Sequence, residues 1–237
     1  MYLYILVSII LTLLFAYGCN TAIRKHAGLF YILAVLVVIF EVLYYQTGLR
    51  DAAPEWITEY IVNPFKRGAL PTAMFMVVMY MGALDAKKPS VSKLLGIRGE
   101  LSIIACILTL GHNIIYGKKQ FVNLFTNPSE MPTQAFIASI ISIIMILIMV
   151  PLMITSFKAV RKKMRAVQWK NLQRWAYVFF GLIYAHIMVL FVPKFSEKYL
   201  DIIAYTLVFG TYAVLRVTKA VSVSKNTSGQ LSSAEKA

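Results

Sequence analysis

Seven apolar segments take up most of this chain, and each approaches or reaches the roughly 20 residues that an α-helix needs to cross the hydrocarbon core of a membrane. Hydrophobic residues make up 59% of the 237 residues. Loops and a polar tail, residues 217–237, account for nearly all the rest, which leaves no room for a separate soluble catalytic domain. The sequence therefore predicts an all-α, polytopic transmembrane bundle of about seven spans. The segments are residues 2–23, 29–46, 69–85, 97–117, 134–157, 172–192 and 199–216.

Positive charge is distributed unevenly along the chain. The formal net charge is +14, from 24 Lys and Arg against 10 Asp and Glu. Lys and Arg accumulate in the cytoplasmic loops of membrane proteins, and here most of them fall in one set of alternate loops, above all in residues 158–174. This asymmetry predicts a multi-pass protein of the plasma (inner) membrane, with its N-terminus outside and its C-terminus in the cytoplasm. Topology and contact with membrane lipid explain the charge, so no nucleic-acid partner is expected.

Two of the three histidines lie inside apolar segments. His112 belongs to the segment 97–117 and His186 to the segment 172–192, whereas His26 lies in a basic loop, where we expect it to be solvated. An ionisable side chain within a membrane span is costly and is a functional-site hypothesis by default. Both segments start on the predicted cytoplasmic side, and each histidine lies roughly 22 Å along its helix. The two imidazoles are therefore expected at one depth, in the outer half of the bundle.

Two imidazoles from different helices at one depth are what a bis-histidine haem requires. Haem iron takes one axial nitrogen on each face, and filling both sites favours electron transfer over oxygen activation. Gly111 and Gly181 lie near the ligands and would give the flat macrocycle room. The spacing also allows an interhelical hydrogen bond, or a metal-transport or proton-relay site. Three lysines just outside the spans are candidates for contacts with haem propionates: Lys118, Lys119 and Lys194.

Few other side chains in the spans are suited to chemistry. Cys19 and Cys106 belong to no CxxC motif, so the signatures of iron–sulfur clusters, c-type haem and zinc sites are absent. Glu41 is the one carboxylate well within a span, near its predicted outer end. Its side chain either reaches the membrane interface or contacts a proton path or a quinone.

Two stretches of sequence resemble a known family. Residues 94–98 (LLGIR), followed by Gly111-His112, resemble a segment of ferric reductase-like transmembrane domains. Thr155-Ser156, residues 169–177 (WKNLQRWAY) and His186 resemble a second segment of the same family. The closest form is the haem-binding membrane subunit of the periplasmic methionine sulfoxide reductase system. The resemblance covers roughly residues 68–216.

The resemblance implies a six-helix ferric reductase-like pattern with an extra helix at the N-terminus. It divides the chain into an N-terminal two-helix region with an outer loop (1–67), a haem-binding helical core (68–216) and a polar cytoplasmic tail (217–237). It also implies that His112 and His186 are the axial ligands of the haem iron. Gln173 stands where the family has a further histidine, so we expect one haem b, near the outer face.

A flavin such as FMN is a further implied cofactor, bound at the inner side. The candidate contacts for it are Arg98, Trp169, Lys170 and Arg174. These features predict a membrane electron-transfer (oxidoreductase) subunit, a b-type cytochrome that carries electrons from a cytoplasmic donor to an extracytoplasmic acceptor or reductase subunit. Three alternatives stay open: a quinol-linked cytochrome b in which Glu41 handles a proton, a haem-free transporter that uses the histidines as proton or metal sites, and a structural membrane anchor.

Overall fold

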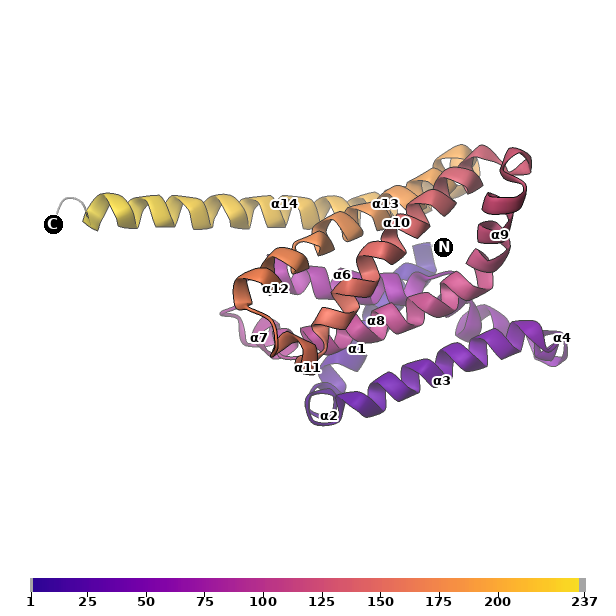
Figure 1. The fold of residues 1–237 in the computed structure, drawn as a ribbon, viewed down its shortest axis with the longest axis horizontal. Coiled ribbons are helices and arrows are strands. Elements are labelled where there is room, and N and C mark those ends of the chain that lie inside the picture. Colours follow the sequence, from indigo (N-terminus) through magenta and orange to yellow (C-terminus); the bar gives the residue numbers. More distant parts are fainter. Residues whose placement is uncertain (1, 235–237) are drawn as a thin grey trace.

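The computed structural model describes residues 2–234, and within them the chain is helical, with no strand (Figure 1). Seven apolar helices correspond to the seven predicted segments. Four stretches are long and apolar enough to cross a membrane: Ala27–Gln46, Arg98–Thr126, Thr133–Ser156 and Ala166–Ser222. The prediction of an all-α helical membrane protein is confirmed. The apolar helices are α1 (Tyr2–Gly18), α3 (Ala27–Gln46), α6 (Ala69–Ala83), α8 (Arg98–His112), α10 (Thr133–Ser156), α13 (Trp175–Phe191) and α14 (Phe195–Ala234).

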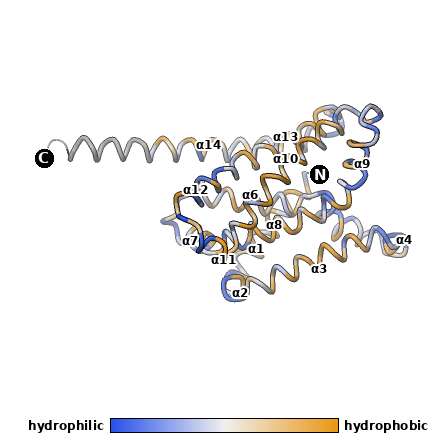
Figure 2. Tube along the Cα trace, in the orientation of Figure 1, coloured by the Kyte–Doolittle hydropathy of each residue, from blue (hydrophilic) through white to orange (hydrophobic). Residues whose placement is uncertain are grey.

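Short helices and turns join these elements at the two ends of the bundle (Figure 1). One end, called here the α12 end, carries α2 (Asn20–Lys25), α7 (Pro89–Leu95), α11 (Lys158–Arg161) and α12 (Ala166–Gln173). The opposite end, called the α9 end, carries α4 (Leu49–Ala52), η1 (Ile57–Val62), α5 (Asn63–Lys66), η2 (Asn113–Gly117), α9 (Lys118–Thr126), η3 (Pro128–Glu130) and η4 (Val192–Lys194). Figure 2 shows hydrophilic residues gathered at these ends and hydrophobic residues along the helices between them.

Helix α6 forms the middle of the bundle. Most of its side chains are buried, and it packs against α1 and α8. Helices α3 and α10 lie further out, and many of their large apolar side chains are exposed, such as Leu36 and Leu147. An apolar surface of this kind is stable where lipid is the solvent, because the helix satisfies its own backbone groups and needs no water.

Two elements extend beyond the predicted segments. The apolar helix that contains His112 continues through the π turn η2 into α9, so that it ends at Thr126 rather than near residue 117. Helix α14 continues through most of the predicted polar tail, and Figure 1 shows this part projecting from the bundle. No proline interrupts α14, so nothing in its backbone ends the helix at residue 216. Residues 235–237 of the predicted tail lie outside the described residues.

The side chain of Lys219 ties α14 to the end of α6. Its ammonium group donates hydrogen bonds to the carbonyl oxygens of Gly82 (2.9 Å) and Leu84 (2.7 Å). The last carbonyls of a helix lack partners within the helix and carry partial negative charge, so a cation stabilises them. This contact holds the first part of α14 beside the bundle before the helix projects from it.

The two glycines expected beside a macrocycle have other surroundings. A Cβ atom at Gly111 would lie 2.9 Å from the Oε2 atom of Glu41 and 3.2 Å from Cγ2 of Val38, both on α3. Gly111 therefore allows α3 to approach α8 closely, and it faces away from any cofactor. A Cβ atom at Gly181 would meet nothing within 4 Å. The prediction that the glycine gives a cofactor room is wrong for Gly111, whereas Gly181 is exposed and has open space beside it.

We predict that Gly111→Ala lowers the stability of the bundle, because the added methyl group would crowd the side chains of Glu41 and Val38 on α3, and these must shift to make room. Overpacking of this kind costs roughly 1–3 kcal/mol of unfolding free energy. Gly181→Ala is the matched control, since it adds the same methyl group in open space and improves helix propensity by up to about 1 kcal/mol. Thermal unfolding of both variants in detergent checks this, and equal unfolding midpoints would contradict it.

Candidate functional site

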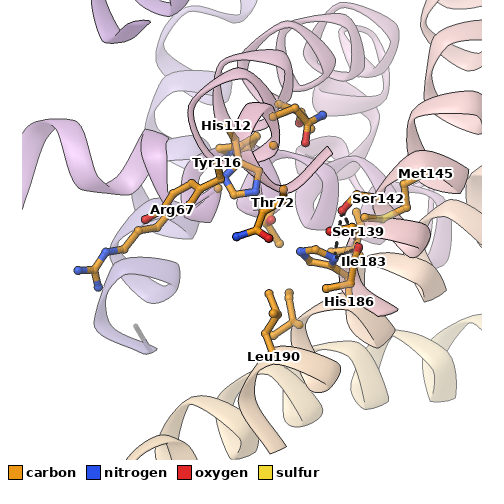
Figure 3. A pocket seen from close by; sticks show the side chains of 18 of the residues that line it. Arg67, Thr72, His112, Tyr116, Ser139, Ser142, Met145, Ile183, His186 and Leu190 are labelled. Carbon is orange, nitrogen blue, oxygen red and sulfur yellow. Dashed lines mark hydrogen bonds between the residues drawn. The ribbon is translucent and has the colours of Figure 1, made fainter. Parts of the chain in front are cut away.

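A cavity of about 560 Å³ lies at the α9 end of the bundle and contains both span histidines (Figure 3). Ligand cavities in proteins typically measure roughly 300–1,000 Å³, so a cofactor fits within this volume. Helices α6, α8, α10 and α13 form its walls. The apolar part of the lining includes Phe75, Met145, Met149, Phe179, Ile183 and Leu190.

His112 is the last residue of α8 and is held by the chain before α6. Its Nδ1–H group donates a hydrogen bond to the carbonyl oxygen of Lys66, with the two atoms 2.6 Å apart. A carbonyl oxygen only accepts, so the proton lies on Nδ1 and the lone pair of Nε2 is left for a ligand. Gly68, in the left-handed conformation with φ of 70°, brings the backbone close to this ring: a Cβ atom there would lie 3.3 Å from Nδ1.

His186 lies on α13 and is held by α10 in the same way. Its Nδ1–H group donates to the carbonyl oxygen of Ala138 at 3.2 Å and lies 3.3 Å from the hydroxyl oxygen of Ser142. Figure 3 shows the two imidazoles projecting into the cavity from different walls. A histidine that binds a metal usually donates its other ring N–H to a backbone carbonyl or a carboxylate, which fixes the ring and its tautomer. Both histidines have this arrangement.

The donor set of the cavity restricts what it can hold. No group of three or more His, Cys, Asp or Glu suited to a metal ion occurs among the residues that the structure describes. A structural zinc ion is normally held by four protein ligands and a catalytic one by three, so two imidazoles do not complete such a site. A haem needs only two axial ligands from the protein, because its macrocycle supplies the other four nitrogens. The residues present therefore fit a bis-histidine haem better than a bare ion.

Cations line the open edge of the cavity. Lys194, a predicted propionate contact, is among them, and so are Arg67 and Lys198, which the sequence analysis did not single out. Lys198 also forms an ion pair with Asp201 at 3.5 Å. Lys118 and Lys119 are exposed on α9 and are not among the lining residues. Arg67 and Lys198 lie far apart in the sequence, so only the fold brings them to one edge.

A second cavity, of about 280 Å³, lies nearer the α12 end. Of the four candidate flavin contacts, Arg98 and Trp169 line it, whereas Lys170 and Arg174 are exposed and do not. The Trp169 indole N–H donates to the carbonyl oxygen of Thr155 (3.0 Å). Gln173 also lines this cavity, and its amide donates to the hydroxyl oxygen of Thr155 (3.2 Å). Phe75, Met149 and Phe179 line both cavities and separate them.

The remaining polar candidates lie outside the two cavities. His26 is exposed, as expected for a loop residue. Glu41 is 2% exposed, so its side chain does not reach the surface of the bundle. Neither of its carboxylate oxygens has a hydrogen-bond partner among the described residues. Of the two interpretations of Glu41, the structure supports a buried group.

Comparison with known proteins finds a family match for much of the segment that lines these cavities. Residues 67–184 match the family described as "Ferric reductase like transmembrane component". This segment is similar to ferric reductase-like transmembrane domains. It contains α6, α8 and α10 with His112, and it ends two residues before His186.

One similar protein is an uncharacterized protein of Treponema pallidum (strain Nichols). It is 32% identical over 224 residues, which are 93% of this chain and 61% of that protein. The chain therefore spans less than two thirds of the length of this relative. No solved structure matches the chain significantly.

We predict that Gly68→Ala destabilises the protein more than Gly48→Ala. Both glycines have a positive φ, 70° and 74°, which costs a residue with a side chain roughly 1–2 kcal/mol. Only Gly68 also has a neighbour, the His112 ring, whereas Gly48 has nothing within 4 Å. The difference between the two unfolding midpoints in detergent isolates the contact with His112. Equal losses would show that the ring yields to the methyl group without cost.

Proposed function

We propose that this chain is a b-type cytochrome subunit that carries electrons across the membrane through one haem held by His112 and His186. The observation that carries the proposal is the pair of imidazoles in one cavity, each with Nδ1 hydrogen-bonded to a backbone carbonyl and Nε2 left for iron. The match of residues 67–184 to the ferric reductase-like family supports the same class of chemistry.

Different residues of the chain would orient the axial ligands, provide positive charge and exclude water around such a cofactor. A bound haem supplies a reversible one-electron centre, and the protein fixes its depth and tunes its potential. The carbonyls of Lys66 and Ala138 orient the two imidazoles and increase their basicity toward iron. Arg67, Lys194 and Lys198 provide positive charge for carboxylates at the open edge, while the apolar walls exclude water.

The direction of transfer follows from the charge of the two ends. The basic α11–α12 region, residues 158–174, faces the cytoplasm under the rule that Lys and Arg accumulate there. Electrons then enter at the α12 end from a cytoplasmic donor and leave at the α9 end for an extracytoplasmic acceptor or reductase subunit.

The second cavity supports an entry site for a planar donor such as a flavin, because Arg98 and Trp169 offer a cation and an aromatic ring there. A relationship to the haem subunit of the methionine sulfoxide reductase system remains part of this proposal.

Purified wild-type protein is expected to bind about one haem per chain, with a low-spin b-type signal in the dithionite-reduced minus oxidised spectrum. His112→Ala and His186→Ala each remove an axial ligand, so both lose the signal. His26→Ala is the control, because His26 is exposed and distant from both cavities, and it keeps the signal. Wild-type protein that folds without haem would overturn the proposal. A ratio near two would place a second haem in the chain.

Arg98→Gln is expected to weaken binding of FMN to the purified protein, measured by quenching of flavin fluorescence. Loss of a charge-assisted hydrogen bond costs roughly 1.5–3 kcal/mol, or about a tenfold or greater rise in Kd. Lys170→Gln and Arg174→Gln remove exposed charges outside the cavity and leave the Kd unchanged. The same loss in all three variants would indicate general electrostatic attraction to the basic surface, and no binding by the wild type would remove the flavin from the proposal.

A further inference from the structure

Glu41 is a buried carboxyl group that the arrangement of the haem site does not use. It lies on α3, and its carboxylate packs against the backbone of Gly111, the residue before His112. Both oxygens are buried without a hydrogen-bond partner among the described residues. An isolated carboxylate in an apolar interior costs several kcal/mol, so such a group is easily protonated. The hydroxyl group of Tyr45, one helical turn further along α3, is a second buried polar group without a hydrogen-bond partner among the described residues.

Positive charge stands near Glu41 without pairing with it. The Lys66 ammonium lies 3.9 Å from the centre of the Tyr45 ring and 5.3 Å from that of Tyr116. Burial first, and then the charges of Arg50 and Arg67, lower the pKa of Lys66, whereas the charge of Glu41 raises it. The backbone carbonyl of this same lysine accepts the hydrogen bond from His112. Lys66 therefore interacts with Glu41 through its ammonium group and with His112 through its backbone carbonyl.

We propose that Glu41 takes up one proton when the metal centre at His112 takes up one electron. The inference rests on the proposed function, because it requires a redox centre at that position. In a medium of low dielectric constant, two charges interact far more strongly than at the same separation in water. An added electron near an ionised Glu41 is therefore opposed, and uptake of a proton by the carboxylate removes this opposition.

The step balances in electrons and protons. A one-electron reductant such as a reduced flavin would supply the electron to the ferric centre. A proton from the bulk solvent would form an O–H bond on the Glu41 carboxylate. The total charge of the site is then the same before and after reduction. This preserves the electrostatic balance that a buried site needs, since burying a new net charge would be costly.

Other titratable or charged groups face Glu41 from the elements packed around it. Lys66 on α5, Tyr45 on α3 itself and Tyr116 in η2 interact with it electrostatically. Arg50 on α4 acts on Tyr45 and Lys66, and His112 on α8 follows Gly111, the residue that Glu41 contacts. The tyrosines are neutral in the physiological range and Arg50 is always charged. The Nδ1 proton of His112 is held by a carbonyl, and its Nε2 faces the cavity. Glu41 is thus the group of this set that is best suited to change its charge with the redox state.

A redox titration at several pH values, between about pH 5 and pH 9, tests the inference on purified, haem-loaded protein. One proton per electron makes the midpoint potential fall as pH rises, by about 59 mV for each tenfold change in proton concentration. In Glu41→Gln, a neutral variant of the same shape, the potential should not vary with pH and should equal the low-pH value of the wild type. Glu100→Gln is the control, because Glu100 is buried at the other end of α8 and paired with Lys158 (2.6 Å), and it keeps the wild-type slope.

Infrared difference spectroscopy gives a second readout. Reduction of the wild type should produce the C=O stretch of a protonated carboxyl group, which shifts in D2O and is missing in Glu41→Gln. A wild-type potential that does not depend on pH, or a slope that persists in Glu41→Gln, would overturn the inference while the haem spectrum stayed intact. Failure of the proposed function looks different, because the wild type would then show no haem signal at all.

Discussion

The site depends on two helices that run in the same direction. Helices α8 and α13 both start at the α12 end, so a histidine near the far end of each reaches the same level of the bundle (Figure 1). In an antiparallel pair, the same offset along each helix would place the histidines at opposite ends. The helix α10 between them in the sequence returns the chain to the α12 end, and its carbonyl at Ala138 also holds His186. Helix α10 therefore sets both the direction of α13 and the orientation of the His186 imidazole.

Backbone carbonyls, rather than acidic side chains, orient both imidazoles. Within a membrane most carbonyls are already used by their own helix, so a carbonyl that accepts a side-chain bond must be at a helix end or share its lone pairs. The carbonyl of Lys66 is at such an end, before the left-handed Gly68 that opens α6. Ala138 lies inside α10, and its oxygen also accepts from Ser142 (2.9 Å). A neutral carbonyl adds no charge to the site, which leaves Glu41 as the nearby group that can respond to a change of charge.

The amino-acid sequence was enough to predict the fold class and that His112 and His186 lie at one level of the bundle, because both follow from one-dimensional patterns. Segment length and hydropathy identified the helices, and alternation of loops gave equal depths to His112 and His186. It was not enough to predict Arg67 and Lys198 as lining residues, because the fold alone brings the turn before α6 and the first turn of α14 to the same cavity. Gly111 shows the same limit. Its nearness to His112 in sequence suggested room for a cofactor, but on a helix the adjacent residue points about 100° away, here toward α3.

The two cavities are lined by different polar side chains. The first has two imidazoles, whereas the second has Gln173, whose amide is already bonded to the Thr155 hydroxyl and is a poor ligand for iron. The rings of Phe75 and Phe179, 5.0 Å apart and edge to face, stand between the cavities with Met149. An electron donor in the second cavity would be separated from the proposed haem by this one layer of side chains. Electron transfer between them would then need no second metal centre. A glutamine at position 173 is then compatible with the proposed transfer through the bundle, provided that the donor itself enters the membrane domain at the α12 end.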